Sequence, residues 1–98
     1  MTLRIVRMHF TEASAKEFFE IFNQHKSAIR HFPGCLHLEL LKDPNHSATF
    51  TTLSQWNNPE SLEGYRKSEL FAAIWAKVKP LFAERSQAFS LEKFIEVD

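Results

Sequence analysis

The chain has 98 residues, its 12 Lys and Arg are balanced by 12 Asp and Glu, and 44% of its residues are hydrophobic. This length favours a single domain, and zero net charge excludes the strong positive field by which many proteins attract nucleic acids or acidic membranes. We therefore expect no nucleic-acid and no membrane partner. A chain this short buries only about two-thirds of its unfolded surface, so a second subunit would stabilise it.

The first elements along the chain are a strand and a long helix. Residues 3–10 alternate in the way typical of a strand. Its two faces carry Val6, Met8 and Phe10 on one side and Ile5, Arg7 and His9 on the other. Ser14 and Glu17 match a capping box and predict that a helix begins there, and Pro33-Gly34 ends the helical pattern. The apolar stripe of this helix is Ala15, Phe18, Phe19, Phe22 and Ile29.

Two further strands are predicted to form a hairpin. Residues 35–43 alternate, and residues 48–56 are rich in Thr and aromatic side chains, with turn-forming residues between the two segments. The alternation in the first segment places Leu36, Leu38 and Leu40 on one face and Cys35, His37 and Glu39 on the other.

The last third of the chain predicts two helices and a strand. Asn58-Pro59 is typical of a helix N-terminus, and the helix is expected to run to about Lys67. Ser68 caps a second helix, whose apolar stripe is Phe71, Ile74, Trp75, Val78 and Phe82. Residues 88–97 alternate imperfectly and favour a final strand.

This order of elements predicts an α+β, ferredoxin-like βαββαβ fold with a four-stranded antiparallel sheet covered by helices on one face. The uncovered face is expected to carry a mixture of apolar and polar residues: Ile5, Arg7, His9, Cys35, His37, Glu39, Thr51 and Leu53. A second copy of the chain is the natural cover for such a face. We therefore expect a two-fold homodimer.

An ordered set of residues resembles the antibiotic biosynthesis monooxygenase superfamily of small dimeric α+β-barrel proteins. The set comprises Phe32-Pro33-Gly34-Cys35, Leu38, Leu40, Asp43, the segment Phe50 to Trp56, Leu62, Tyr65-Arg66, Ser68, Phe71 and Trp75. The resemblance covers essentially the whole chain. It implies one domain over residues 1–98.

The resemblance also implies a chemistry. Oxygenases of this family use neither flavin nor metal: a phenolic or quinol substrate loses a proton, and the resulting anion reduces O₂ directly. Their pocket lies between the sheet and the helices. The family's Asn, Trp and Tyr site positions fall on Ser61, Tyr65 and Phe71, of which only Tyr65 keeps a polar group suited to orienting a substrate.

Several aromatic side chains are candidates for a flat binding pocket. Tyr65 and Trp75 would line it together with Phe22, Phe71 and Phe89, and Thr52 or Ser54 would hydrogen-bond a buried N–H or O–H group. The alternative interpretation is that these rings are ordinary core residues. Histidine side chains ordinarily titrate near neutrality, so His9 or His37 is a candidate general base, and a structural role in the dimer is the alternative.

No metal, flavin or nicotinamide motif is found. His31, Cys35 and His37 lie close in sequence, but no further ligand follows at a spacing typical of zinc. The single cysteine and the absence of a secretory signal pattern predict a cytoplasmic protein.

The leading functional hypothesis is oxygenation of a small phenolic, quinol or polycyclic substrate, with Tyr65 orienting it and His9 assisting proton removal. Two alternatives remain open. One is a non-catalytic or sensory dimer that binds a small hydrophobic ligand, and the other is a sugar mutarotase. A dry aromatic pocket would favour the first two hypotheses, and a wet pocket lined by His and Tyr would favour the third.

Overall fold

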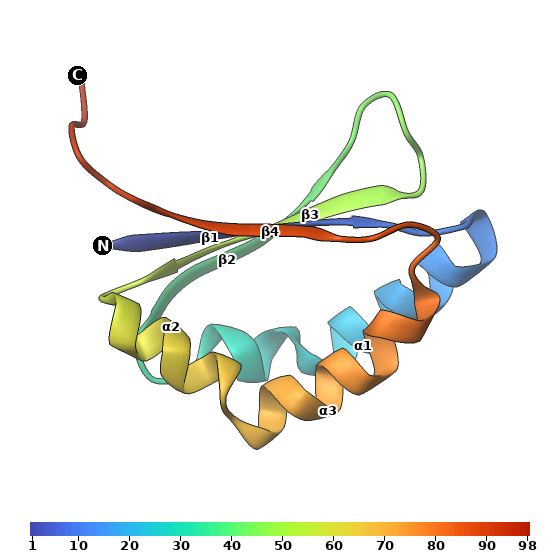
Figure 1. The fold of residues 1–98 in the computed structure, drawn as a ribbon, viewed down its shortest axis with the longest axis horizontal. Helices are drawn as coiled ribbons and strands as arrows, with labels where there is room; N and C mark the ends of the chain where they lie inside the picture. Colours follow the sequence, from blue (N-terminus) through green and yellow to red (C-terminus); the bar gives the residue numbers. More distant parts are fainter.

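Alternating strands and capped helices form in the order that the sequence predicts, as seen in a computed structural model that describes residues 1–98. The elements are β1 (Thr2–His9), α1 (Glu12–Arg30), β2 (Cys35–Lys42), β3 (Thr49–Trp56), α2 (Pro59–Arg66), α3 (Glu69–Val78), a 3-10 turn (Lys79–Leu81) and β4 (Gln87–Glu92). The strands form one antiparallel sheet in the order β2-β3-β1-β4. All three helices lie on one side of this sheet (Figure 1). The ferredoxin-like α+β fold is therefore confirmed.

The helix N-termini are held by side-chain caps. Asn58 and Ser68 cap α2 and α3 as predicted, because their side-chain oxygens accept hydrogen bonds from backbone N–H groups three residues later. The predicted start of α1 is wrong by three residues: the cap is Thr11, and Ser14 is its partner in the capping box. The Ser14 hydroxyl also donates to the Leu81 carbonyl at 2.9 Å, which ties the start of α1 to the turn after α3.

A bulge near the start of β2 changes which side chains face the helices. Cys35 pairs with Trp56 but His37 pairs with Gln55, so Leu36 is an extra residue in β2. Cys35 is consequently buried at 7% exposure, whereas Leu36 is 42% exposed. The prediction that Cys35 shares the uncovered face with His37 is wrong, because uninterrupted alternation does not hold across a bulge.

The connection from α1 to β2 passes close to the first turn of α2. Gly34 has a φ of 89°, a conformation that side-chain-bearing residues rarely adopt. A Cβ atom at this position would overlap the side chain of Ser61. The Gly34 carbonyl also accepts a hydrogen bond from Asn57 N at 2.9 Å. These contacts fix the start of α2 against the start of β2.

Two clusters of buried side chains pack between the helices and the sheet. The larger consists of Met8, Phe10, Ala15, Phe18, Phe50 and Val78, and the smaller consists of Cys35, Trp56 and Leu62. Phe19 belongs to the predicted apolar stripe of α1, yet its side chain is 38% exposed and packs its ring against Phe50 at 4.8 Å between centroids.

The other face of the sheet has no helix over it (Figure 1). Large apolar side chains are exposed along β4, with Phe89 at 48% and Leu91 at 50% exposure. The last strand ends earlier than predicted, at Glu92, and beyond it Phe94 is 93% exposed and Ile95 is 75% exposed. None of the helices combines the length and hydropathy that a bilayer-spanning segment needs.

Candidate functional site

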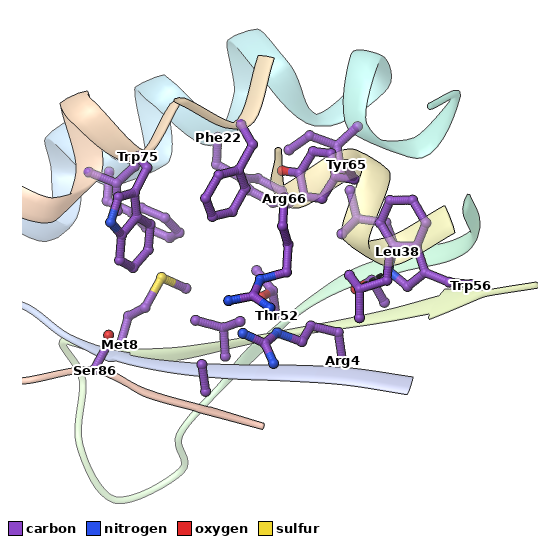
Figure 2. A pocket seen from close by; sticks show the side chains of 18 residues that line it. Arg4, Met8, Phe22, Leu38, Thr52, Trp56, Tyr65, Arg66, Trp75 and Ser86 are labelled. Atoms are coloured by element: carbon purple, nitrogen blue, oxygen red, sulfur yellow. Dashed lines mark hydrogen bonds between the residues drawn. The ribbon is translucent and has the colours of Figure 1, made fainter. Parts of the chain in front are cut away.

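A cavity of about 340 Å³ lies between the two buried clusters, on the helix side of the sheet (Figure 2). Of the 18 residues that line it, 13 are hydrophobic, so a ligand inside would contact mainly apolar atoms. The polar exceptions are Arg4, Thr52, Ser54, Arg66 and Ser86, to which Tyr65 adds a hydroxyl. Ligand sites typically span about 300–1,000 Å³, so this volume suits a small ligand.

Aromatic rings from β3, α2 and α3 form one wall of the cavity. Tyr65 stacks on Trp56 with centroids 5.1 Å apart, and the edge of Phe71 meets Tyr65 at 5.3 Å. Phe71 in turn stacks on Trp75 at 5.8 Å. α2 and α3 are separated by a break, at which Ser68 caps α3. This break lets rings from both helices meet in this way. Phe22 of α1 lines the same cavity.

The hydroxyl of Tyr65 is available to a ligand. The only hydrogen bond to Tyr65 from a side chain is made by the Ser68 hydroxyl to its backbone carbonyl, and none uses the phenol. Burial raises the pKa of Tyr65 to about 12, with a smaller contribution from the neighbouring Cys35 thiol. The phenol therefore stays protonated at neutral pH, where it can donate a hydrogen bond but cannot act as a base.

The two hydroxyl side chains of β3 that line the cavity, those of Thr52 and Ser54, differ in their partners. The Ser54 hydroxyl accepts a hydrogen bond from Trp56 Nε1 at 3.0 Å, instead of serving Tyr65 or Trp75 as the sequence suggested. Thr52 also lines the cavity, beneath the rings of α2 and α3 (Figure 2). Thr52 is therefore the hydroxyl of β3 that is better placed to meet a ligand.

Two arginines that the sequence did not identify as site residues reach the cavity. Arg4 projects from β1 on the same face as Val6 and Met8, and Arg66 projects from the last turn of α2. Figure 2 shows both guanidinium groups reaching the same part of the cavity, close to Thr52. Strand alternation could have identified Arg4, because an even-numbered residue of β1 shares a face with Val6 and must point towards the helices.

The two arginines differ in whether an acidic side chain compensates their charge. Arg66 contacts the Glu63 carboxylate at 3.4 Å, whereas the hydrogen bond of the Arg4 side chain goes to the neutral Ser90 hydroxyl at 3.1 Å. Burial lowers the pKa of Arg4, and the positive charge of Arg66 lowers it further, with Glu63 opposing both. The cavity therefore holds more positive than negative charge.

His9 and Phe89, also predicted for the site, lie on the uncovered face of the sheet. The ring nitrogens of His9 lie 3.1 Å from Thr49 Oγ1 and 3.3 Å from Gln87 Oε1. Phe89 pairs with Ile5, which occupies an odd-numbered position of β1 like His9. The sheet therefore separates both side chains from Tyr65, and no His, Asp or Glu lines the cavity. The geometry does not support proton removal by His9 beside Tyr65.

Metal-ligating side chains do not cluster. No group of three or more His, Cys, Asp and Glu residues is placed to hold a metal ion. The thiol of Cys35 is buried, and burial raises its pKa, which lowers its reactivity as a nucleophile.

Residues 1–77 match the family model described as antibiotic biosynthesis monooxygenase. The chain belongs to this family. No curated protein matches it in sequence.

Solved structures that resemble this family member share its whole fold. A proposed antibiotic biosynthesis monooxygenase from Deinococcus radiodurans superposes with a TM-score of 0.91 at 14% identity, covering 100% of this chain and 97% of the other. A second, from Caulobacter crescentus CB15, gives 0.88 at 19% identity, covering 96% and 90%. A conserved protein from Methanosarcina mazei Go1 gives 0.88 at 16% identity, covering 96% and 94%. At these identities the likeness establishes the fold.

Of the three site positions that the family resemblance implies, two line the cavity of this antibiotic biosynthesis monooxygenase family member. Tyr65 and Phe71 face the cavity, whereas Ser61 does not line it. Ser61 instead lies against Gly34, where its side chain occupies the space that a Cβ atom at position 34 would need.

Proposed function

We propose that this protein is a monooxygenase that oxidises a small phenolic, quinol or polycyclic aromatic substrate with O₂, without metal or flavin, in the cavity between the helices and the sheet. The observation that carries the proposal is the aromatic wall of the cavity, which holds the free hydroxyl of Tyr65. Family membership adds the reaction class.

The cavity residues have a limited role in this reaction. Phe71 and Trp75 would pack against the faces of the substrate rings, and Tyr65 would donate a hydrogen bond to a substrate oxygen. Since no carboxylate or imidazole lines the cavity, the substrate proton would leave to solvent before or during binding. The apolar walls would then keep water away from the electron-rich anion.

The reaction balances without a further reductant. The substrate anion donates electrons to O₂, and a peroxide forms at a ring carbon that carries hydrogen. Loss of water then leaves a carbonyl at that carbon. One oxygen atom of O₂ is retained by the product, and the other leaves as water with two hydrogens from the substrate.

The cavity also bears on the alternatives. A sugar mutarotase would need polar groups around the sugar and a side chain that exchanges protons, whereas 13 of the 18 lining residues are hydrophobic and none is histidine. A non-catalytic module that binds a small aromatic ligand is the second candidate, because the cavity lacks a general base and still provides aromatic walls.

A homodimer is the assembly that the uncovered face supports. Phe89 and Leu91 are half exposed there, and exposed apolar patches on a sheet mark contact surfaces. Two copies packed sheet to sheet would bury both side chains in each. The cavities, on the helix side, would stay open to substrate.

Oxygen uptake tests the reaction. Purified protein would be mixed with naphthalene diols and anthrones in the presence of a chelator, and spontaneous autoxidation would be subtracted. We expect substrate-dependent uptake that falls about tenfold in Tyr65→Phe, a loss of about 1.4 kcal/mol of transition-state stabilisation. Because His9 lies across the sheet, His9→Ala is expected to stay within about twofold of the parent.

Two results would contradict these expectations. Binding of the same rings without uptake above autoxidation would favour the ligand-binding module. A loss of activity in His9→Ala as large as that in Tyr65→Phe would place proton transfer on the uncovered face of the sheet.

A further inference from the structure

Two guanidinium groups in a largely apolar cavity need an explanation. Charged groups are rarely placed against apolar surface unless a counter-charge compensates them. Arg66 has Glu63 as a partner at 3.4 Å, but no carboxylate lies within ion-pair distance of Arg4. Arg7, on the other face of the same strand, does have one, since it contacts Asp43 at 2.9 Å.

We propose that the cavity binds an aromatic anion, with its rings against Phe71 and Trp75 and its ionised oxygen between Arg4 and Arg66. The inference deepens the proposed function by naming the charge of the substrate, and it holds for a binding protein as well. The ligand is thus an aromatic acid, in the form of either a carboxylate or an ionised phenol.

The positions of the two arginines carry this inference. They come from different layers, Arg4 from β1 and Arg66 from α2, and approach the same part of the cavity from the sheet and from the helices (Figure 2). Thr52 lies beside them and Tyr65 lies on the adjoining wall. An oxygen anion between the arginines would leave the attached rings directed towards the aromatic wall.

The local charge supports an anion over a neutral ligand. The chain has no net charge, so the excess of positive charge in the cavity is a local feature. The positive charge of Arg66 contributes to the lowered pKa of Arg4, and an anion placed between the two arginines would relieve that repulsion. Guanidinium groups also bind carboxylates through paired N–H donors, which gives the ligand a fixed orientation.

The anion also fits the absence of a base in the cavity. Positive charge near a phenol stabilises the phenolate and lowers the pKa of the phenol. The arginines would therefore take the place of a general base by favouring the ionised substrate. Tyr65, protonated at neutral pH, would supply an additional hydrogen bond to the anion.

Binding of matched probes tests the proposal. The fluorescence of the tryptophans, or calorimetry, would report binding of 2-naphthoate and of its neutral counterpart 2-naphthamide at neutral pH. For the phenol form, the absorbance of bound 2-naphthol would be followed as pH rises. We expect naphthoate to bind at least about tenfold more tightly than naphthamide, or the pKa of bound naphthol to fall by about one unit or more.

Variants assign the effect to the two arginines. In Arg4→Gln and Arg66→Gln the preference for naphthoate, or the shift of the naphthol pKa, is expected to fall severalfold, while Arg4→Lys retains part of it. The matched controls are Arg7→Gln on the other face of β1 and Lys67→Gln, which also contacts Glu63 but does not line the cavity. Both controls are expected to bind like the parent.

Each outcome decides the inference. A preference for naphthoate identifies a carboxylate ligand, and a shift of the naphthol pKa alone identifies a phenolate. Equal binding of naphthoate and naphthamide with no pKa shift overturns the proposal, as does the absence of binding by all three probes. If Arg4→Gln does not fold, Arg66→Gln at the exposed end of α2 carries the test. Oxygen uptake is not measured, so this result is independent of the monooxygenase proposal.

Discussion

The two faces of the sheet differ in what covers them, although the same strands supply both. On the helix side, Met8 and Phe50 are buried at 4% exposure, and a cavity opens between two packed clusters. On the other side, Phe89 and Leu91 are half exposed beside paired charges such as Arg7 and Asp43. Alternate residues of one strand thus face a cavity on one side and an exposed, partly apolar surface on the other.

β1 shows this division within three residues. Arg4 points to the helix side and has a neutral hydrogen-bond partner, whereas Arg7 points to the open side and has a carboxylate partner. The same residue type therefore supports two roles: an unpaired guanidinium suits a ligand, and a paired one suits a structural contact. The following predictions test how separate the two faces are.

The largest effect is expected in the packed cluster on the helix side. Phe18 is 3% exposed and stacks on Phe10 at 4.6 Å, so Phe18→Ala should lower the free energy of unfolding by about 3–5 kcal/mol. The neighbouring Phe19 is 38% exposed, and Phe19→Ala should cost about 1 kcal/mol. Urea denaturation measures both. Equal losses would show that the packed cluster extends to the surface of α1.

The open face should control assembly. Sedimentation is expected to show a dimer of the parent at micromolar concentration, and Phe89→Asp should weaken it by about 100-fold or more, or about 2.7 kcal/mol. The control is Ala73→Asp at an exposed position on α3. A parent protein that sediments as a folded monomer would refute the dimer. Weakening by both variants would move the interface to the helix side.

The ionisation of Tyr65 tests how dry the cavity is. Tyr65 is the only tyrosine in the chain, so tyrosinate absorbance reports it alone. Its pKa should lie near 12 in the folded protein and near 10 in urea. The raised pKa means that the folded state favours the protonated phenol. The resulting contribution to the free energy of unfolding is fully present below pH 10 and is lost as pH rises towards 12.

The loss at alkaline pH should be roughly 2–3 kcal/mol, from about 1.4 kcal/mol for each pKa unit. Tyr65→Phe should lack this part of the alkaline destabilisation when its denaturation curves are compared with those of the parent. A folded-state pKa near 10 would mean that water reaches the hydroxyl freely and that the cavity is wet.

The smallest effect is expected at Asp43 on the open side. A hydrogen bond from Asn45 N, and secondarily the Arg7 side chain, hold the pKa of Asp43 below its ordinary value. This contribution to stability is present above the unfolded-state pKa and is lost as pH falls through the lowered one. Asp43→Asn should therefore show a shallower loss of stability in acid. Identical acid profiles would show that the contacts of Asp43 do not contribute to stability.

The fold was largely predictable from sequence because its signals are local. Asn58 and Ser68 marked two helix starts correctly, and alternation, together with the Thr and aromatic content of residues 48–56, located the four strands. Errors arose where a local pattern had two solutions. Ser14 matched a capping box as its first member, but it is the last member of one that begins at Thr11. The bulge after Cys35 depends on pairing with β3, which a single segment does not reveal.

The candidate site was predictable only for its apolar part. The rings of Phe71 and Trp75 were identifiable because helical spacing puts them on one stripe of α3, and Tyr65 was identifiable because it falls on a site position that the family resemblance implies. Arg4 was missed because a charged residue in a strand is normally assigned to solvent, and only its shared face with Val6 indicates otherwise. His9 was chosen for its chemistry, although alternation already placed it opposite Val6.

The contact between Gly34 and Ser61 restricts how this site can evolve. Position 34 can accept no side chain in its present conformation, because its φ is positive and a Cβ atom there would overlap the side chain of Ser61. The packing of the beginning of α2 against position 34 therefore tolerates few substitutions. A lineage under selection for a new ligand would have to reshape the cavity beyond that point, through the rings of Tyr65, Phe71 and Trp75, which line the cavity and take no part in the contact between Gly34 and Ser61.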